Sequence, residues 1–475
     1  MTIQGQSQTG TIIDAQNAGR IFTTNSSVTV NLKNLTLKNG NSGVNGGAIN
    51  NTYGNTLIVT SCTFINNTAT GDGGAIHNDG TLTVTGCKFT GNSAKRGGAI
   101  FTDGISTVTG STFTGNTANK GGAFFNYGGD ATSRIFKFNR IVGNNLEGSD
   151  IYNDMGTIDA TLNWWGSNNS PAERIDINTG NPGTTVLYDP WIVLSITANP
   201  SLIAKNGHST ITVDLQHDNN GTVHNPSEGV IPYTGPANFA TTIGTISNTN
   251  FNSNGIATST LNGGSSISGT ANVYASLDGQ PVLASVVVDV KAPTVTANPE
   301  EGVYNTSKSV SLKMNEAGTI FYTLNGSTPT TSSSKYTTPL LISSSMTLKF
   351  FARDLAGNKS KIYTKTYTID KTAPKVVSTV PANLKTGVSR TSTIAVKFSE
   401  NFNASTYWSS IKVKNLTTGK FITINKTISS NMLYINTATK AANTWYQIII
   451  PAKAIKDSAG NNLLATYTFK FKTGN

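Results

Sequence analysis

Two acidic residues occupy equivalent places in a repeated stretch of the sequence: Asp79 lies in HNDG and Asp103 lies in FTDG. If successive repeats stack as neighbouring strands, their carboxylates lie about 4.8 Å apart, where one can raise the pKa of the other. Because such a pair can act as acid and base on a glycosidic bond, Asp79 and Asp103 are the candidate catalytic residues. Asp before Gly is also typical of tight turns. We favour the turn interpretation, since no third acid or base joins the pair.

A repeat must position these acids. The tetrapeptide GGAI begins at Gly46, Gly73 and Gly97, and GGAF begins at Gly121. Short alternating apolar clusters separated by Gly, Asn and Thr indicate three short strands per repeat. A period of 24 to 27 residues is typical of a solenoid. We therefore predict a parallel β-helix in which each Gly pair makes a corner with positive φ.

Alignment of the repeats brings matching side chains into two columns. The apolar column contains Phe64, Phe89 and Phe113, extended by Leu37 and Ile141, and the amide column contains Asn67, Asn92 and Asn116. We expect the first column to fill the core and the second to form a buried ladder of side-chain amides. About five or six coils are legible.

The pattern FxxN followed by GGAI resembles the polymorphic outer-membrane-protein repeat. The whole segment looks like the β-helix of adhesin-like surface proteins, many of them from methanogenic archaea, and Asp159–Pro171 with Asp189–Ile192 resembles the cap and exit of such helices. The resemblance implies a β-helix with a C-terminal cap over residues 1–190. The first line, TIQGQSQTGTIIDAQNAGRIF, looks like an early but not initial coil, which leaves open whether Met1 is the natural start.

Other side chains of this segment have two interpretations each. Trp164 and Trp165 suit either a platform for sugar rings or a plug over the end of the helix, and we favour the plug. Cys62 and Cys87 occupy equivalent places and suit either a disulfide between coils or a reduced stack, and we favour the stack. A column of charged residues before the Gly pairs is expected to form a surface stripe: Asp72, Arg96 and Lys120.

From Val193 onward, strands of five to eight residues alternate with Gly, Asn and Pro turns, which predicts β-sandwiches. Proline-containing linkers at Lys291–Pro299 and Asp370–Pro381 separate them. Residues 191–291 resemble an invasin-type Ig-like domain, residues 292–370 the C-terminal domain of chitobiase and β-hexosaminidase, and residues 371–475 an Ig-like module of S-layer proteins. The expected fold class is thus all-β, with a right-handed parallel β-helix followed by three tandem Ig-like β-sandwiches.

The basic charge is concentrated at one end of the chain. Residues 371–475 contain 14 Lys or Arg against 2 Asp or Glu, and 13 of the 14 are Lys. Lysine attracts anions, but it lacks the forked set of donors with which arginine recognises nucleic-acid bases. No nucleic-acid motif accompanies the charge. We expect an acidic polymer or glycan as partner rather than nucleic acid, unless this module is merely soluble and lysine-rich. The candidate ligand-binding residues are Trp408, Trp445, Lys412 and Lys414.

No metal or cofactor is expected. The turns DLAGN at Asp354–Asn358 and DSAGN at Asp457–Asn461 offer fewer oxygens than calcium takes. The histidines His208, His217 and His224 show no spacing that promises convergence on zinc.

These features favour a non-enzymatic, adhesin-like cell-surface protein whose β-helix is displayed on an Ig-like stalk and binds a polysaccharide or protein of a cell surface or wall. Two alternatives stay open: a polysaccharide lyase or hydrolase with accessory sandwiches, and a structural component of a viral fibre or envelope layer.

No apolar run is long enough to span a membrane, and no signal peptide is visible. Sequons such as Asn25, Asn34 and Asn305 give weak support for an extracellular location. Ligand identity, anchoring mode and oligomeric state stay open.

Overall fold

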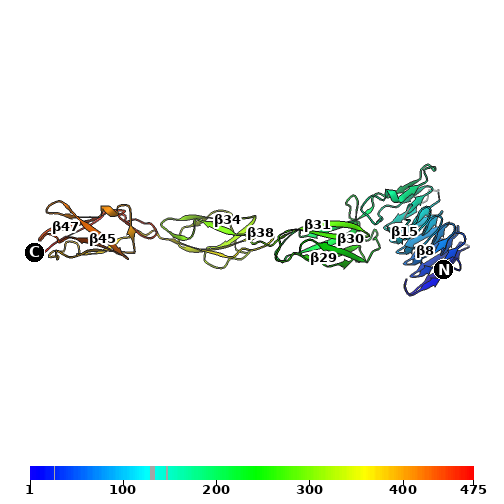
Figure 1. Cartoon of the computed structure of the whole chain (residues 1–475), viewed down its shortest axis with the longest axis horizontal. Helices are drawn as coiled ribbons and strands as arrows, with labels where there is room; N and C mark the ends of the chain where they lie inside the picture. Colours follow the sequence, from blue (N-terminus) through cyan, green and yellow to red (C-terminus); the bar gives the residue numbers. More distant parts are fainter. Residues whose placement is uncertain (26, 129–133, 146–147) are drawn as a thin grey trace. The chain divides into compact units, whose positions relative to one another are not determined.

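The protein is all-β (Figure 1). The computed structural model describes residues 1–25, 27–128, 134–145 and 148–475. These residues contain no α-helix, only single 3-10 turns at Ala172–Arg174 and Trp408–Ser410, and hence no helix that could cross a membrane. The chain divides into two compact units, Met1–Val290 and Lys291–Asn475.

The first unit begins with a β-solenoid of about seven turns, built from three parallel sheets. The first sheet contains β1 (Thr2–Gln4), β4 (Thr29–Lys33), β8 (Thr56–Thr60), β12 (Thr81–Thr85), β15 (Ile105–Thr109), β18 (Arg134–Lys137), β21 (Thr157–Asp159) and β23 (Thr185–Leu187). The second sheet contains β2 (Ile12–Asp14), β5 (Thr36–Lys38), β9 (Thr63–Ile65), β13 (Lys88–Thr90), β16 (Thr112–Thr114) and β19 (Arg140–Val142). The third sheet contains β3 (Phe22–Thr24), β7 (Ile49–Asn51), β11 (Ile76–Asn78), β14 (Ile100–Thr102), β17 (Phe124–Asn126), β20 (Ile151–Asn153) and β22 (Ile175–Ile177). A short pair, β6 (Asn41–Ser42) and β10 (Thr68–Ala69), lies outside these sheets.

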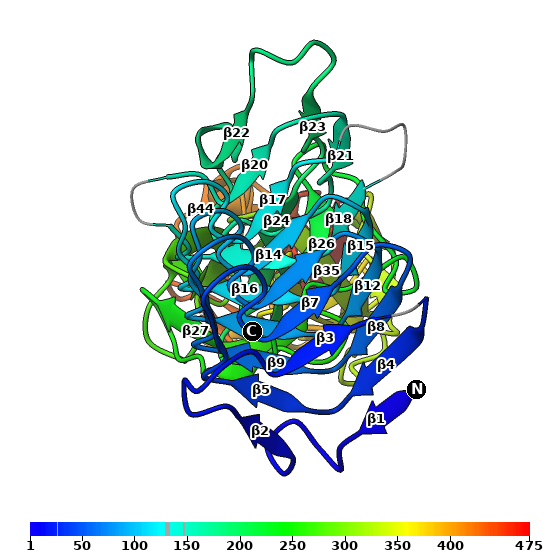
Figure 2. The ribbon, with the colours of Figure 1, turned by 90° about the vertical axis from the view of Figure 1, so that its right-hand side faces the viewer.

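The predicted columns are confirmed. Phe64, Phe89 and Phe113 stack with ring centroids 4.7 and 4.8 Å apart and planes within 1° of parallel. All three rings are fully buried. Successive rungs lie one above another, as β3, β7, β14, β17 and β20 show in Figure 2. The solenoid core is therefore a stack of like side chains.

The amide column is also confirmed as a buried ladder. The Nδ2 of Asn67 donates to Oδ1 of Asn92 at 2.9 Å, and the Nδ2 of Asn92 donates to Oδ1 of Asn116 at 2.8 Å. Each Oδ1 also accepts the backbone N–H of the preceding rung, as Asn92 does from Asn67 at 3.0 Å. Every polar atom of the ladder thus has a partner inside the protein.

The Gly pairs are corners, as predicted. Gly73 has a φ of +70°, and a Cβ on Gly74 would lie 2.1 Å from the carbonyl oxygen of Gly98 in the next rung. The first Gly supplies the left-handed backbone, and the second lets two rungs approach closely. The expected number of five or six coils is too low, because the turns that contain β1–β3 and β20–β23 lack GGAI.

Cys62 and Cys87 are free, buried thiols on neighbouring rungs. The backbone N–H of Cys62 donates to Sγ of Cys87 at 3.3 Å. The reduced stack is therefore the arrangement found.

A first sandwich completes the first unit. One sheet contains β24 (Ile192–Asn199), β26 (His208–Asp218) and β29 (Ile256–Asn262), and the other contains β25 (Leu202–Ala204), β31 (Gln280–Asp289), β30 (Gly269–Leu277), β27 (Pro236–Thr241) and β28 (Thr249–Asn250). Its core continues into the solenoid through Phe138, Leu162 and Trp164. Asp278 accepts a hydrogen bond from Trp164 Nε1 at 2.7 Å and pairs with Arg140. The solenoid and this sandwich therefore share a core.

The second unit contains two further sandwiches. The earlier one has β32 (Val295–Asn298), β34 (Lys308–Met314) and β37 (Leu340–Ile342) in one sheet, and β33 (Gly302–Tyr304), β39 (Tyr363–Ile369), β38 (Met346–Asp354), β35 (Gly318–Thr323) and β36 (Ser334–Lys335) in the other. The later one has β40 (Val376–Val380), β41 (Ile394–Phe398), β46 (Met432–Thr437) and β45 (Ile424–Ser429) in one sheet, and β44 (Phe421–Ile422), β43 (Lys412–Asn415), β47 (Trp445–Ile450) and β49 (Tyr467–Lys472) in the other. The strands β42 (Asn403–Ala404) and β48 (Ile455–Lys456) form a short pair beside them.

Candidate functional site

An open groove on the solenoid contains both acids that the sequence singled out. Its volume is about 830 Å³. It runs along the turns that connect the third sheet to the first sheet. The lining residues are Tyr53, Gly54, Asn55, Thr56, Asp79, Gly80, Thr81, Asp103, Gly104, Ile105 and Gly128.

The register of the third sheet stacks the two acids. Asn78 of β11 pairs with Thr102 of β14, so Asp103 follows one rung after Asp79. The backbone N–H of Asp79 donates to Asn51 O and that of Asp103 to Asn78 O, both at 2.8 Å. These contacts hold the acids in equivalent turns, as the sequence predicts.

The surroundings of Asp79 shift its pKa towards neutral pH. Burial, and then the carboxylates of Asp103 and Asp72, raise the pKa of Asp79 to about 6. His77 Nδ1 lies 3.6 Å from Oδ1 of Asp79, but burial lowers the pKa of His77 to about 4, so this imidazole is neutral at pH 7. The groove therefore offers carboxylate oxygens that accept hydrogen bonds, and one group that changes protonation near pH 6.

An outer aromatic ladder beside the groove was missed by sequence reasoning. His77, Phe101, Phe125 and Tyr152 stack on successive rungs, with ring centroids 4.9, 5.2 and 5.0 Å apart. Each is the middle residue of a third-sheet strand, so it points away from the core. The sequence does contain a sign of this ladder. In three repeats the residue that directly follows GGAI or GGAF is aromatic: His, Phe and Phe.

The expected surface stripe of charge lies over this ladder. Isolated parallel β-bridges join the backbones of Asp72, Arg96 and Lys120 on successive rungs. However, Asp72 is only 8% exposed, and Arg96 donates to both of its carboxylate oxygens at 2.8 and 2.6 Å. The guanidinium of Arg96 lies 5.1 Å from the ring centroid of Phe101. The stripe therefore includes the buried Asp72, the half-buried Arg96 and the exposed Lys120, and its long side chains fold over the apolar ladder.

Trp164 and Trp165 offer no platform for sugars, because they are 0% and 2% exposed. Trp165 packs in the solenoid core, and Trp164 packs in the core shared with the first sandwich. Both rings therefore stabilise the end of the solenoid.

Three of the four candidate ligand-binding residues lie on one sheet of the last sandwich. Lys412 and Lys414 belong to β43, and Trp445 belongs to the neighbouring β47. Trp408 lies elsewhere: its ring packs partly against the core, and its carbonyl oxygen accepts a hydrogen bond from Lys426 Nζ at 2.6 Å. The sheet that carries the other three is the second place where a ligand could bind.

Carboxylates gather at one end of the last sandwich. Oxygens of Asp370, Glu400 and Asp457 lie within 4.8 Å of one another, and burial and the two neighbouring acids raise the pKa of Glu400. Asp457 already accepts hydrogen bonds from the backbone N–H and Nδ2 of Asn461 at 2.7 and 2.8 Å. Clusters of exposed acids are common without a bound ion, so this cluster alone defines no metal site.

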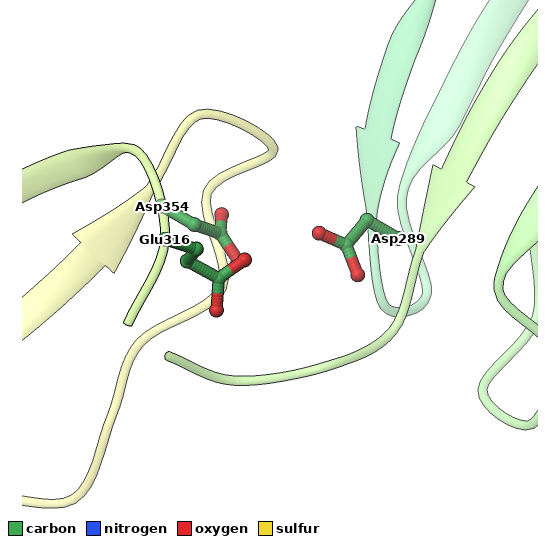
Figure 3. A group of neighbouring side chains, drawn as sticks. All are labelled: Asp289, Glu316 and Asp354. Carbon is green, nitrogen blue, oxygen red and sulfur yellow. The ribbon is translucent and has the colours of Figure 1, made fainter. Parts of the chain in front are cut away.

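The earlier sandwich of the second unit carries a related pair. Figure 3 shows the carboxylates of Glu316 and Asp354 turned towards each other. Asp354 accepts hydrogen bonds from the backbone of Gly357 and Asn358 at 2.6 and 2.8 Å. The Asp of this DLAGN turn is therefore occupied by its own turn, as expected.

Two of the three histidines of the first sandwich, His217 and His224, pair with separate acids. His217 Nδ1 lies 2.7 Å from Asp214 Oδ1, and His224 Nε2 lies 3.1 Å from Asp218 Oδ2. Within the described residues, no group of three or more close potential metal ligands includes a histidine.

Four segments match the models of three known families. Residues 299–364 match the model of the chitobiase/β-hexosaminidase C-terminal domain, and residues 370–473 match that of a bacterial Ig-like domain. Residues 61–79 and 86–103 match the repeat of the Chlamydia polymorphic membrane protein. The resemblance of the repeat and of residues 292–370 is thus confirmed, and that of residues 371–475 is confirmed at the level of a bacterial Ig-like domain. The invasin-type resemblance of residues 191–291 stays a prediction.

Several solved structures are similar to part of this chain. A three-domain fragment of titin is 10% identical, with 59% of this chain and 99% of that chain covered and a TM-score of 0.29. The Escherichia coli adhesin FdeC is 14% identical, with 58% and 96% covered and a TM-score of 0.29. A C-terminal fragment of intimin, solved in complex with the intimin-binding domain of its translocated receptor, is 14% identical, with 59% and 99% covered and a TM-score of 0.27. Comparison with curated proteins found no match.

Proposed function

We propose that this protein is a non-enzymatic, adhesin-like protein of a cell surface, of the methanogen type, and that its solenoid groove binds an uncharged polysaccharide. The observation that carries the proposal is the groove itself, which holds Asp79 and Asp103 on adjacent turns beside the 88% exposed ring of Tyr53. The polymorphic-membrane-protein repeat and the tandem Ig-like modules support a surface location.

The groove has the chemistry of a sugar site. Carboxylate oxygens accept hydrogen bonds from pairs of sugar hydroxyls, and the exposed ring of Tyr53 offers an apolar face to the C–H side of a sugar ring. Asn55 and Thr81 add an amide and a hydroxyl to the lining. An acidic glycan would be repelled by Asp79 and Asp103, so we expect a neutral one.

Binding is tested with the full chain against mannan and laminarin, by retardation in polysaccharide-containing gels. The double substitution Asp79→Asn with Asp103→Asn should weaken binding at least about tenfold. Glu173→Gln with Asp176→Asn is the matched control, because it removes two exposed acids of the same unit that do not line the groove. Equal loss in both variants, or no binding by the wild type to neutral glycans, would contradict the proposal.

A hydrolase is the second candidate, because the raised pKa of Asp79 beside a second acid suits a proton donor. New reducing ends released by the wild type, but not by the Asp79→Asn, Asp103→Asn variant, would establish the enzyme. Binding without release of reducing ends favours the adhesin.

A role as a component of a viral fibre or envelope layer is distinguished by labelling intact cells with antibodies, since that role requires an ordered array rather than dispersed single molecules.

A further inference from the structure

The outer face of one sheet in the last sandwich carries lysines and aromatic rings together. Strands β44, β43, β47 and β49 lie in that order. Their inward side chains, such as Val413, Ile448 and Phe471, are buried in the core. The alternate residues therefore point outward and make up the surface that we call the lysine face. Its members are Lys412, Lys414, Phe421, Trp445, Gln447, Ile449, Lys470 and Lys472.

The aromatic rings of the lysine face lie among the ammonium groups. Lys412 Nζ and Lys414 Nζ lie 4.8 and 5.9 Å from the ring centroid of Phe421, which is 52% exposed. Lys470 Nζ lies 5.4 Å from the ring centroid of Trp445. These contacts keep the rings and the charges at one surface, available to the same ligand.

The strand register spreads the charge across the lysine face. Lys412 pairs with Ile449, Lys414 pairs with Gln447 and Phe421, Lys470 pairs with Gln447, and Lys472 pairs with Trp445. No lysine of the face has another lysine directly opposite, so the protein avoids the closest like-charge contacts. The two acids of residues 371–475, Glu400 and Asp457, belong to no strand of this sheet. The lysine face thus carries four lysines and no acid, and none of these lysines lies directly opposite another.

We propose that the lysine face is a docking surface for a polyuronate, a polysaccharide that carries a carboxylate on its sugar units. Charge complementarity supplies the attraction, and Trp445 and Phe421 supply apolar faces for the sugar rings. Lysine ammoniums act as point charges that suit separate carboxylates, whereas recognition of phosphates favours the arginine fork, which this face lacks. This site lies in the second unit and is independent of the solenoid groove.

The test uses the full chain and immobilised polygalacturonate at low and high NaCl. The variant Lys412→Gln, Lys414→Gln, Lys470→Gln, Lys472→Gln should weaken binding at least about tenfold. The matched control is Lys375→Gln, Lys397→Gln, Lys453→Gln, Lys456→Gln, which removes the same charge from exposed positions outside this sheet, and it should weaken binding less than about threefold. Phe421→Ala should weaken polygalacturonate binding without changing the dependence on salt, because it removes no charge.

Single-stranded DNA and vesicles that contain anionic lipid are the competing ligands in the same assay. Both should bind more weakly than polygalacturonate. Equal loss in the two four-lysine variants would overturn the proposal, because it would show attraction by net charge alone. Tighter binding of DNA or of vesicles, lost in the face variant, would overturn it in favour of a nucleic-acid or a membrane surface.

Discussion

The solenoid and the last sandwich place like charges in opposite ways. In the solenoid neighbouring turns repeat one another, so Asp79 and Asp103 stack directly, and burial and then the nearby carboxylates raise the pKa of Asp79 to about 6. In the last sandwich the cross-strand partners of Lys412, Lys414 and Lys472 on the lysine face are neutral. A repeat therefore places like charges close together, which increases the repulsion between them. An antiparallel sheet can spread many like charges over one face with little repulsion.

The same difference extends to the cores, and truncation of the solenoid stack should have the largest effect. Phe89→Ala removes a fully buried ring between Phe64 and Phe113 and should lower the free energy of unfolding of the first unit by about 3–5 kcal/mol. Urea unfolding followed by circular dichroism measures it. Phe421→Ala, at a 52% exposed ring, is the comparison and should cost much less. Similar losses for both would show that Phe89 is not stacked.

The amide ladder should come next. Asn92→Ala leaves the backbone N–H and Nδ2 of Asn67 without their acceptor and should cost about 2–3 kcal/mol. Asn425→Ala changes an exposed residue of the last sandwich and should stay within about 0.5 kcal/mol. The same unfolding experiment compares them, and a loss below about 1 kcal/mol for Asn92→Ala would contradict a closed ladder.

A smaller effect should follow from placing a like charge within the lysine face. Gln447→Lys puts an ammonium opposite both Lys414 and Lys470 and should destabilise the last sandwich by roughly 1 kcal/mol at low salt. High salt should restore most of this loss. Gln447→Met serves as the neutral control. Stability unchanged by Gln447→Lys at low salt would show that the register does not space the charges.

The smallest effect concerns the pH dependence at Asp79. In the folded protein its pKa is raised from 3.8 to about 6, so the stability of the wild type falls as pH rises between these values. Asp79→Asn should therefore be more stable than the wild type at pH 7, and the difference should vanish below pH 4. Because the side chain is 37% exposed, the gain should stay below about 1 kcal/mol.

Urea unfolding at several pH values measures this difference, with Asp176→Asn, at an exposed position of β22, as control. A pH-independent difference for Asp79→Asn, or the same profile for both variants, would show that the pKa of Asp79 is not raised in the folded protein.

The sequence predicts the solenoid well because identical side chains recur at one period, so Phe64, Phe89 and Phe113 define both the register and the core. Periodicity does not show which neighbours a long side chain reaches, and so it does not predict the contacts of Arg96 with Asp72 and Phe101.

In the last sandwich, strand alternation places Trp445 outward and Tyr446 in the core. Trp408 lies in a 3-10 turn, where alternation gives no guidance. The grouping of Asp370, Glu400 and Asp457 was also beyond sequence reasoning, because it joins three segments through long-range packing.

The solenoid groove and the lysine face are proposed as two separate sites, one for neutral and one for anionic glycans, and one measurement tests this most directly. The wild type, the Asp79→Asn, Asp103→Asn variant and the four-lysine face variant are each titrated with mannan, laminarin and polygalacturonate. The aspartate variant should lose binding only to the neutral glycans, and the lysine variant should lose binding only to polygalacturonate. If either variant lost both kinds of ligand, or neither kind, the two-site account would be contradicted.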